Sequence, residues 1–310
     1  MLGKVCPYLV PPMIAFSRDA LFADAASIRS HPNFAAAKRR HTDTGLVVAD
    51  GNPMVAKLIC QTGRYATMAL ILSLYDMADG GPTTGATASQ LLAAIGRTPF
   101  ASVSWAKLMV RVFHRAGLVD YAPPGPDRRS RPFYPTPKLV EMGQHSIAIF
   151  LEALGEVRSL PAPADELARR PGVFTGFARV VVDCYFHHRF SMLEPFPETD
   201  ALFKRDFGYL VFAHLLQTMH ETPEGVFCSA PAGELSRRYG MARGSVRNIL
   251  DVAEDLGLVT PVSKGGHLMR CTPKFVELSD QWAATDLAWL SFILDTTLER
   301  LEQRPALKAA

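Results

Sequence analysis

The 310-residue sequence has few cysteines, and they follow no spacing pattern. The five are far apart and include no C-x-x-C pair: Cys6, Cys60, Cys184, Cys228 and Cys271. This odd, scattered set argues against a disulfide scaffold and is typical of a reduced, cytoplasmic protein. Hydrophobic residues make up 48% of the chain and charged residues 20%, which indicates a globular protein with a sizeable core.

Long apolar runs and a strong charge excess are also missing. The longest apolar run, "YATMALILSLY" (65–75), is too short to span a bilayer and predicts a buried helix. The segment "CPYLVPPMIAF" (6–16) contains a proline pair and lacks a small-residue cleavage site, so we expect no secretion signal. The formal net charge is only +3, so a surface for a polyanion must be local.

The familiar catalytic motifs are absent from the sequence. It contains no Walker loop, G-x-G-x-x-G, G-x-S-x-G or H-E-x-x-H, and no pattern pairs a nucleophile with a base. Cys184, His187 and His188 share a face at helical spacing, but a zinc site needs further ligands, and no second cluster supplies them. We therefore expect neither an enzyme nor a bound cofactor or metal.

What the sequence does contain is a repeat. "TPKLVE" (136–141) returns as "TPKFVE" (272–277), and each follows a "GLV" tripeptide, at 117–119 and 257–259. Around these markers both halves predict a long apolar helix, a short helix, a third helix, a hairpin and a final helix. The expected long, short and final helices cover 64–78, 88–96 and 142–156, then 207–220, 232–240 and 280–302. We infer two units about 140 residues apart, covering 1–160 and 161–310.

The third helix of each unit has one apolar side and ends at a glycine suited to a helix C-cap. Its apolar positions are Ala106, Met109, Val110, Phe113 and Ala116 in the first unit, and Val246, Ile249, Leu250, Ala253 and Leu256 in the second. Expected helix starts are the capping pair Thr87–Gln90 and the pairs Thr98–Pro99 and Ser229–Pro231. Two helices joined by a glycine-containing turn and followed by a hairpin predict a winged helix-turn-helix.

The string "GPDRRSRPFYPTPKLVE" (125–141) resembles the wing of MarR-type winged-helix transcription regulators, with their Asp-x-Arg element at Asp127 and Arg129. The resemblance implies sequence-specific binding to double-stranded DNA by a transcription regulator. It also implies that Arg129 enters the minor groove while Asp127 orients it. The second wing is shorter, with 15 rather than 19 residues from glycine to threonine, and has no Asp-x-Arg.

Family members carry one unit per chain and pair as homodimers, so two units here imply a covalent pseudo-dimer, either monomeric or paired again. The predicted fold is therefore mainly α with small β wings: tandem winged helix-turn-helix repeats joined by long packing helices. The resemblance also implies a small aromatic ligand near these helices. Their aromatic residues serve either that ligand or the core: Phe150, Phe174, Phe177, Tyr185, Phe186, Trp289 and Phe292.

The expected DNA contacts lie on the polar sides of the third helices and on the wings. In the second helix they are Arg243, Ser245, Arg247 and Asn248, because arginine can pair with guanine and asparagine with adenine. In the first helix they are Ser104 and Lys107, flanked by Ser102 and Arg111, with Trp105 more suited to a core. The wings add Arg128, Arg129 and Arg131 in the first unit and Lys264, beside His267, in the second.

Other interpretations fit the same pattern. The low net charge and Trp105 also suit a tandem winged-helix module that docks a protein partner. A replication-initiator-like DNA-binding protein would share the tandem architecture. The basic wing "DRRSR" (127–131) could also be a solubilising loop.

Overall fold

The computed structural model describes residues 14–49, 60–78, 86–122 and 131–309. Over these ranges the chain is mainly helical, with 13 α-helices and two small antiparallel sheets. None of the helices in the described ranges is long and apolar enough to cross a membrane. The run 65–75 lies in a helix whose side chains are mostly buried, as expected.

The elements follow the same order in the two halves of the chain. The first half contains α1 (Arg18–Arg29), α2 (Phe34–Ala49), α4 (Thr62–Met77), α5 (Ala88–Ile95), α6 (Val103–Arg115), β1 (Val119–Tyr121), β2 (Phe133–Pro135) and α7 (Pro137–Gly155). Their counterparts are α8 (Ala164–Arg169), α9 (Val173–His188), α11 (Gly208–Gln217), α12 (Ala232–Tyr239), α13 (Arg243–Asp255), β5 (Val259–Pro261), β6 (Met269–Cys271) and α14 (Pro273–Ala309). The predicted helices and hairpins are therefore present in both halves.

The second half also contains elements that the sequence pattern did not predict. These are α10 (Pro197–Phe203), β3 (His220–Thr222), β4 (Gly225–Cys228) and the short 3-10 helix η2 (Lys264–Gly266). Strand β4 pairs with β6, so the second sheet has the order β3-β4-β6-β5, whereas β1 and β2 form a sheet of two strands. These strands are three or four residues long, too short to show an alternating pattern.

The repeated hexamer makes the same hydrogen bonds, which form a joint between two helices, in both halves. The Thr136 hydroxyl lies 2.7 Å from the Gly117 carbonyl oxygen and accepts a bond from the Leu139 amide at the start of α7. The Lys138 ammonium donates to the Ala116 carbonyl at 3.1 Å. These side chains tie the end of α6 to the beginning of α7, across the hairpin between them.

In the second half the same types of contact recur at α13 and α14. Thr272 lies 2.7 Å from the Gly257 oxygen, and Lys274 donates to the Leu256 carbonyl at 3.0 Å. Gly117 and Gly257 both adopt a left-handed conformation, with φ of 69° and 68°, which ends the preceding helix. The hexamer is therefore a structural joint between two helices, and it occurs twice because both halves contain the same pair of helices.

Three helix starts were predicted, and two of those predictions are wrong. Thr87 and Gln90 form the expected capping box. Helix α6 is capped by Ser102 instead of Thr98, whose hydroxyl donates to the Ile95 carbonyl. Because α6 begins later, it has 13 residues, the same length as α13.

The start of α12 is the second correction. Pro231 occupies the N-cap position, and no side chain of the described residues caps this end. Ser229 is engaged elsewhere, because its amide and carbonyl both bond to the Thr218 hydroxyl, at 3.0 and 2.8 Å. The first amides of α12 therefore remain without a partner inside the helix.

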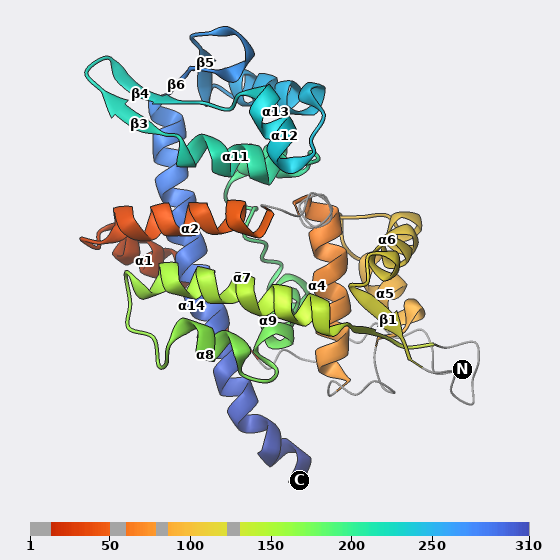
Figure 1. Ribbon diagram of the computed structural model, residues 1–310. Coiled ribbons are helices and arrows are strands. Elements are labelled where there is room, and N and C mark those ends of the chain that lie inside the picture. The colour runs from red at the N-terminus through yellow and green to blue at the C-terminus, as the bar shows by residue number, and fades with distance from the viewer. Residues whose placement is uncertain (1–13, 50–59, 79–85, 123–130, 310) are drawn as a thin grey trace.

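The two halves exchange helix contacts reciprocally (Figure 1). Helix α1 packs on α14 of the other half, and α8 packs on α7. In the same way α2 packs on α11, and α4 packs on α9. Polar contacts join these pairs: the Gln217 amide donates to Asp43 at 2.8 Å, and the Thr175 hydroxyl donates to Asp76 at 3.0 Å.

The apolar core follows this exchange. One cluster fills each half, and a third lies between α1, α7, α8, α9 and α14. Leu46 and Ala49 of α2 belong to the cluster of the second half, whereas Val182 of α9 belongs to that of the first. Helix α14 runs through the molecule behind α2, α7 and α9 in Figure 1, and its residues belong to the second-half cluster and to the third cluster.

A close helix contact depends on a glycine. A Cβ atom added at Gly143 of α7 would lie 2.1 Å from the Phe174 ring of α9. The Phe174 ring occupies the space that a side chain at this position would need, so a larger residue here would have to displace the ring.

Helix α11 carries a buried histidine. His214 is 3% exposed, and its Nδ1 atom has no hydrogen-bond partner among the described residues. Burial lowers the pKa of this imidazole below its ordinary value of 6.5, and the nearby Glu234 only partly offsets the effect. Burial in the folded chain therefore disfavours protonation of His214.

We expect removal of the Thr272 hydroxyl to destabilise the fold. Thr272→Val keeps the side-chain shape but loses the cap of α14 and the bond to Gly257, so the free energy of unfolding should fall by about 1 kcal/mol. Urea unfolding measures the change. Thr260→Val, at an exposed position of β5, is the matched control and should leave the midpoint nearly unchanged.

His214 predicts a loss of stability in mild acid. The unfolded chain takes up a proton near the ordinary histidine pKa, whereas the folded chain resists it, so stability should fall as the pH drops below about 6.5. His214→Leu should flatten this dependence in urea titrations between pH 7.5 and 5.5. An equal slope in the wild type and the variant would contradict this origin.

Candidate nucleic-acid interface

Helix α13 has a buried side and a polar side, as its spacing predicted. Its buried residues are Val246, Ile249, Leu250 and Ala253. Arg243, Arg247 and Asn248 are exposed on the first turns, and Ser245 is half-buried. Three of the four predicted contact residues of this helix are therefore available to a partner, and Ser245 only in part.

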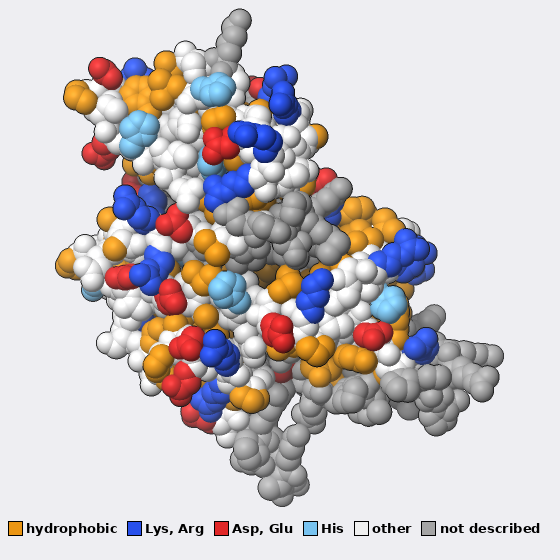
Figure 2. Space-filling model, in the orientation of Figure 1, with side chains coloured by type: hydrophobic (Ala, Val, Ile, Leu, Met, Phe, Trp, Pro, Cys, Tyr) orange, Lys and Arg blue, Asp and Glu red, His pale blue; other side chains and the backbone are white. Residues whose placement is uncertain are grey.

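The charge on α13 changes sign along the helix. Asp251, Glu254 and Asp255 are exposed in its second half, opposite in charge to Arg243 and Arg247 in the first. A polyanion can therefore approach only the N-terminal half. Figure 2 shows arginine and lysine side chains gathered over α12 and α13 on one edge of the molecule.

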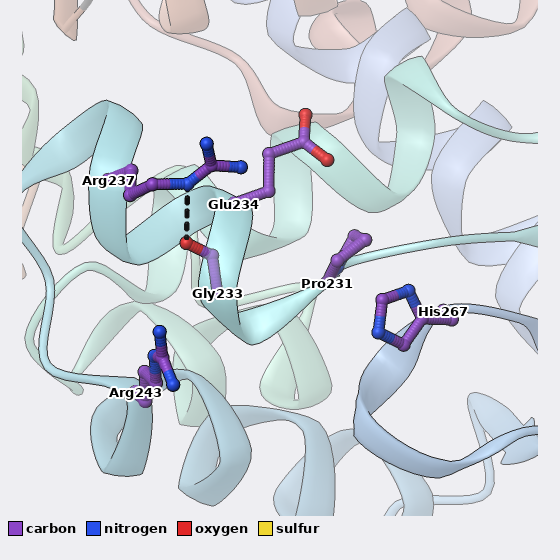
Figure 3. Close-up of a pocket in the computed structure, with 6 residues that line it drawn as sticks. All are labelled: Pro231, Gly233, Glu234, Arg237, Arg243 and His267. Atoms are coloured by element: carbon purple, nitrogen blue, oxygen red, sulfur yellow. Dashed lines mark hydrogen bonds between the residues drawn. The ribbon is translucent and has the colours of Figure 1, made fainter.

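A shallow cleft extends this cationic region to α12 and to the second hairpin (Figure 3). Its lining residues are Pro231, Gly233, Glu234, Arg237, Arg243 and His267. Arg237 lies beside the first turn of α12, where its Nε atom donates to the Gly233 carbonyl at 3.4 Å. Arg237, Arg243 and His267 thus line one cleft with the Glu234 carboxylate and the first turn of α12, and the two arginines make it a candidate site for an oxyanion such as a phosphate.

The tip of the second hairpin is held against the segment that precedes α12. Gly265 and Gly266 have φ of 76° and 77°, and the Gly266 carbonyl accepts from the Ala230 amide at 2.8 Å. This bond places His267 at the cleft. Lys264, a predicted contact, starts η2, but its side chain lies outside the described residues.

Helix α6 presents a different surface. Ser104, Lys107 and Arg111 are exposed, as expected for contact residues. Ser102 caps the helix instead of lying on its outer side. Trp105 is half-buried against the first core, and the Arg64 guanidinium lies 5.8 Å from its ring centroid.

Because α6 and α13 have equal lengths and end at equivalent glycines, their positions can be matched one to one. Val103 stands where α13 has Arg243, and Leu108 stands where it has Asn248. Both side chains are exposed, at 38% and 42%. In Figure 2 hydrophobic side chains accordingly lie beside cationic ones over α6.

The first hairpin is described only at its base. Arg131 is exposed, donates to the Ala122 carbonyl at 3.3 Å and lies over the Tyr121 ring at 5.3 Å. The other predicted wing residues, Asp127, Arg128 and Arg129, lie outside the described residues. The pairing of Asp127 with Arg129 therefore stays a prediction.

One residue near α13 escaped the sequence pattern. Arg205 follows α10, and its Nη1 atom donates to the Asn248 Oδ1 atom at 2.6 Å. The two residues are 43 positions apart in the chain, and no periodicity or motif connects them. Helix α10 packs on α13, and its Glu198 carboxylate lies 2.8 Å from Lys274 of α14; that hydrogen bond lowers the pKa of Glu198.

The metal and ligand candidates are buried or half-buried side chains. Cys184 is buried, which raises the pKa of its thiol to about 12, and burial lowers the pKa of His187. In the described parts of the chain, no group of three or more His, Cys, Asp or Glu residues could hold a metal ion. Among the aromatics considered for a ligand, Phe177 and Trp289 belong to the third cluster, and Trp289 stacks on Phe292 at 5.5 Å.

Comparisons with protein-family models, with curated proteins and with solved structures found no match to this chain.

Proposed function

We propose that the chain is a transcription regulator of the MarR-like winged-helix type that binds double-stranded DNA in a sequence-specific manner. In this proposal residues 1–160 and 161–310 form two winged-helix units. Helices α6 and α13 are their recognition helices, and the chain acts as a covalent pseudo-dimer. The main support is that two helices of equal length, with the same C-terminal joint, both expose cationic residues.

The reciprocal helix packing supports the pseudo-dimer. A two-fold dimer requires each contact between subunits to occur twice with the roles exchanged. The pairs α1–α14 and α7–α8, and α2–α11 and α4–α9, follow that rule within one chain. Recognition helices that enter successive major grooves must lie about 34–36 Å apart, and a shared core can hold such a spacing.

The charges of the second unit support a nucleic-acid partner. Arg243 and Arg247 can reach base edges from the first turns of α13, where a recognition helix meets the major groove. Arg237 and His267, around the cleft at α12, are placed to bind a backbone phosphate beside it. These side chains give the second unit a local positive surface, although the net charge of the whole chain is small.

A second candidate is a protein-interaction module, favoured by Val103 and Leu108. Exposed apolar residues on α6 would suit a protein partner as well as they suit thymine methyl groups. A replication-initiator-like role would use the same two units and needs repeated sites in the DNA. A selection of bound genomic fragments distinguishes single operators from such repeats.

The direct test is a fluorescence anisotropy titration against sheared genomic DNA. We expect binding that weakens steeply between about 50 and 200 mM salt, because phosphate contacts release counterions. Arg247→Ala should reduce the binding free energy for a selected site by about 1 to 3 kcal/mol. Arg169→Ala, an exposed cation on α8 with the same charge change, is the control and should have little effect. No binding at low salt would exclude the proposed function.

Thymine methyl groups provide a test of α6. Replacement of thymine by deoxyuridine throughout a selected half-site removes only methyl groups, so affinity should fall about fourfold for each methyl group that α6 touches. The double variant Val103→Ser/Leu108→Ser should abolish the difference between the two DNAs. If neither change alters affinity, α6 does not read DNA through these residues, and the protein-interaction interpretation of this helix gains support.

A further inference from the structure

The contact between Arg205 and Asn248 determines which atoms Asn248 can offer. A guanidinium has only donors, so the atom that faces Arg205 at 2.6 Å must be the amide oxygen of Asn248. The NH₂ group of the same amide then points away from Arg205. Both residues are exposed, so this contact lies on the surface of the recognition helix.

The backbone around Arg205 is held in place. Its amide donates to the Leu202 carbonyl, and its own carbonyl accepts from the Gly208 amide, both at 3.0 Å. Phe207, at φ 67°, is a buried residue in a left-handed conformation that closes this turn. A guanidinium presented from such a turn has less freedom than one on a flexible loop.

The next residue ties the turn to the other unit. Asp206 lies 3.0 Å from the Arg64 guanidinium of α4, and the Thr62 hydroxyl donates to the Phe203 carbonyl at 3.1 Å. Arg64 in turn lies beside Trp105 of α6. Arg205 is therefore positioned by both units, although its side chain bonds to α13.

We infer that Arg205 is a specificity-determining residue that prevents Asn248 from reading adenine. An asparagine recognises adenine by accepting from N6 and donating to N7, which requires both of its amide atoms. Oδ1 keeps a second lone pair, but the Arg205 guanidinium 2.6 Å away crowds it and repels the partly positive N6 amino group of adenine, so the NH₂ donors become the favoured contact. They match the guanine edge, whose N7 and O6 are both acceptors, so Asn248 should select guanine. The inference rests on the proposed DNA binding and replaces the adenine preference expected from sequence.

The test is a selection of bound sequences from a randomised duplex pool with matched variants. The wild type should favour guanine at the base pair that Asn248 contacts, and Asn248→Ala should lose the preference at that pair alone. Arg205→Ala should raise the ratio of adenine to guanine there on the order of tenfold, since both amide atoms become free. Arg205→Lys, which keeps a donor, should retain guanine.

Lys204→Ala is the control for charge. Lys204, the exposed neighbour of Arg205, follows α10 and pairs with Asp200 of that helix, so its loss removes the same charge without touching Asn248. If Arg205→Ala keeps the wild-type base preference and lowers affinity only as Lys204→Ala does, the inference is wrong while DNA binding stands. Adenine preference in the wild type would also overturn it. A wild type that selects no sequence would overturn the proposed function and the inference together.

Discussion

Reciprocal packing between the two halves is the constraint on which the rest of the structure depends. Helices α2 and α9 each extend from one half into the apolar cluster of the other, and α14 connects the second-half cluster to the one between the halves. Neither half could keep this arrangement alone, since part of each core comes from the other. Helix α6 packs in the first-half cluster and α13 in the second, so the contacts between the halves that complete both clusters also support both helices.

Short polar joints add to the apolar core by fixing the ends of neighbouring helices. The threonine and lysine of each hexamer connect the end of one helix to the start of the next, across hairpins of different length. The joint is the same in both halves while the hairpin is not. The length of a hairpin can therefore vary without moving the helices that flank it, because the bonds of the joint connect those helices directly and do not involve the hairpin tip.

The two halves share a framework but present different surfaces. The second places arginine, asparagine and a cationic cleft at the start of α13, whereas the first places Val103 and Leu108 at the matching positions of α6. A chain with two copies of the unit can present two different surfaces, since each copy can acquire its own substitutions. A homodimer cannot, because one sequence builds both of its faces. If the proposed function holds, the preferred DNA site has two unlike halves.

The repeat, the order of helices and the buried side of α13 can all be predicted from the sequence, since periodicity and helix caps are local properties. The start of α6 could not, because Thr98–Pro99 and Ser102 are both good helix starts and packing in the folded chain chose the second. The exchange of α2 and α9, the addition of β4 to the second sheet and the meeting of Arg205 with Asn248 emerge only in three dimensions. These contacts join residues far apart in the chain, and no local pattern encodes which distant side chain fills a given space.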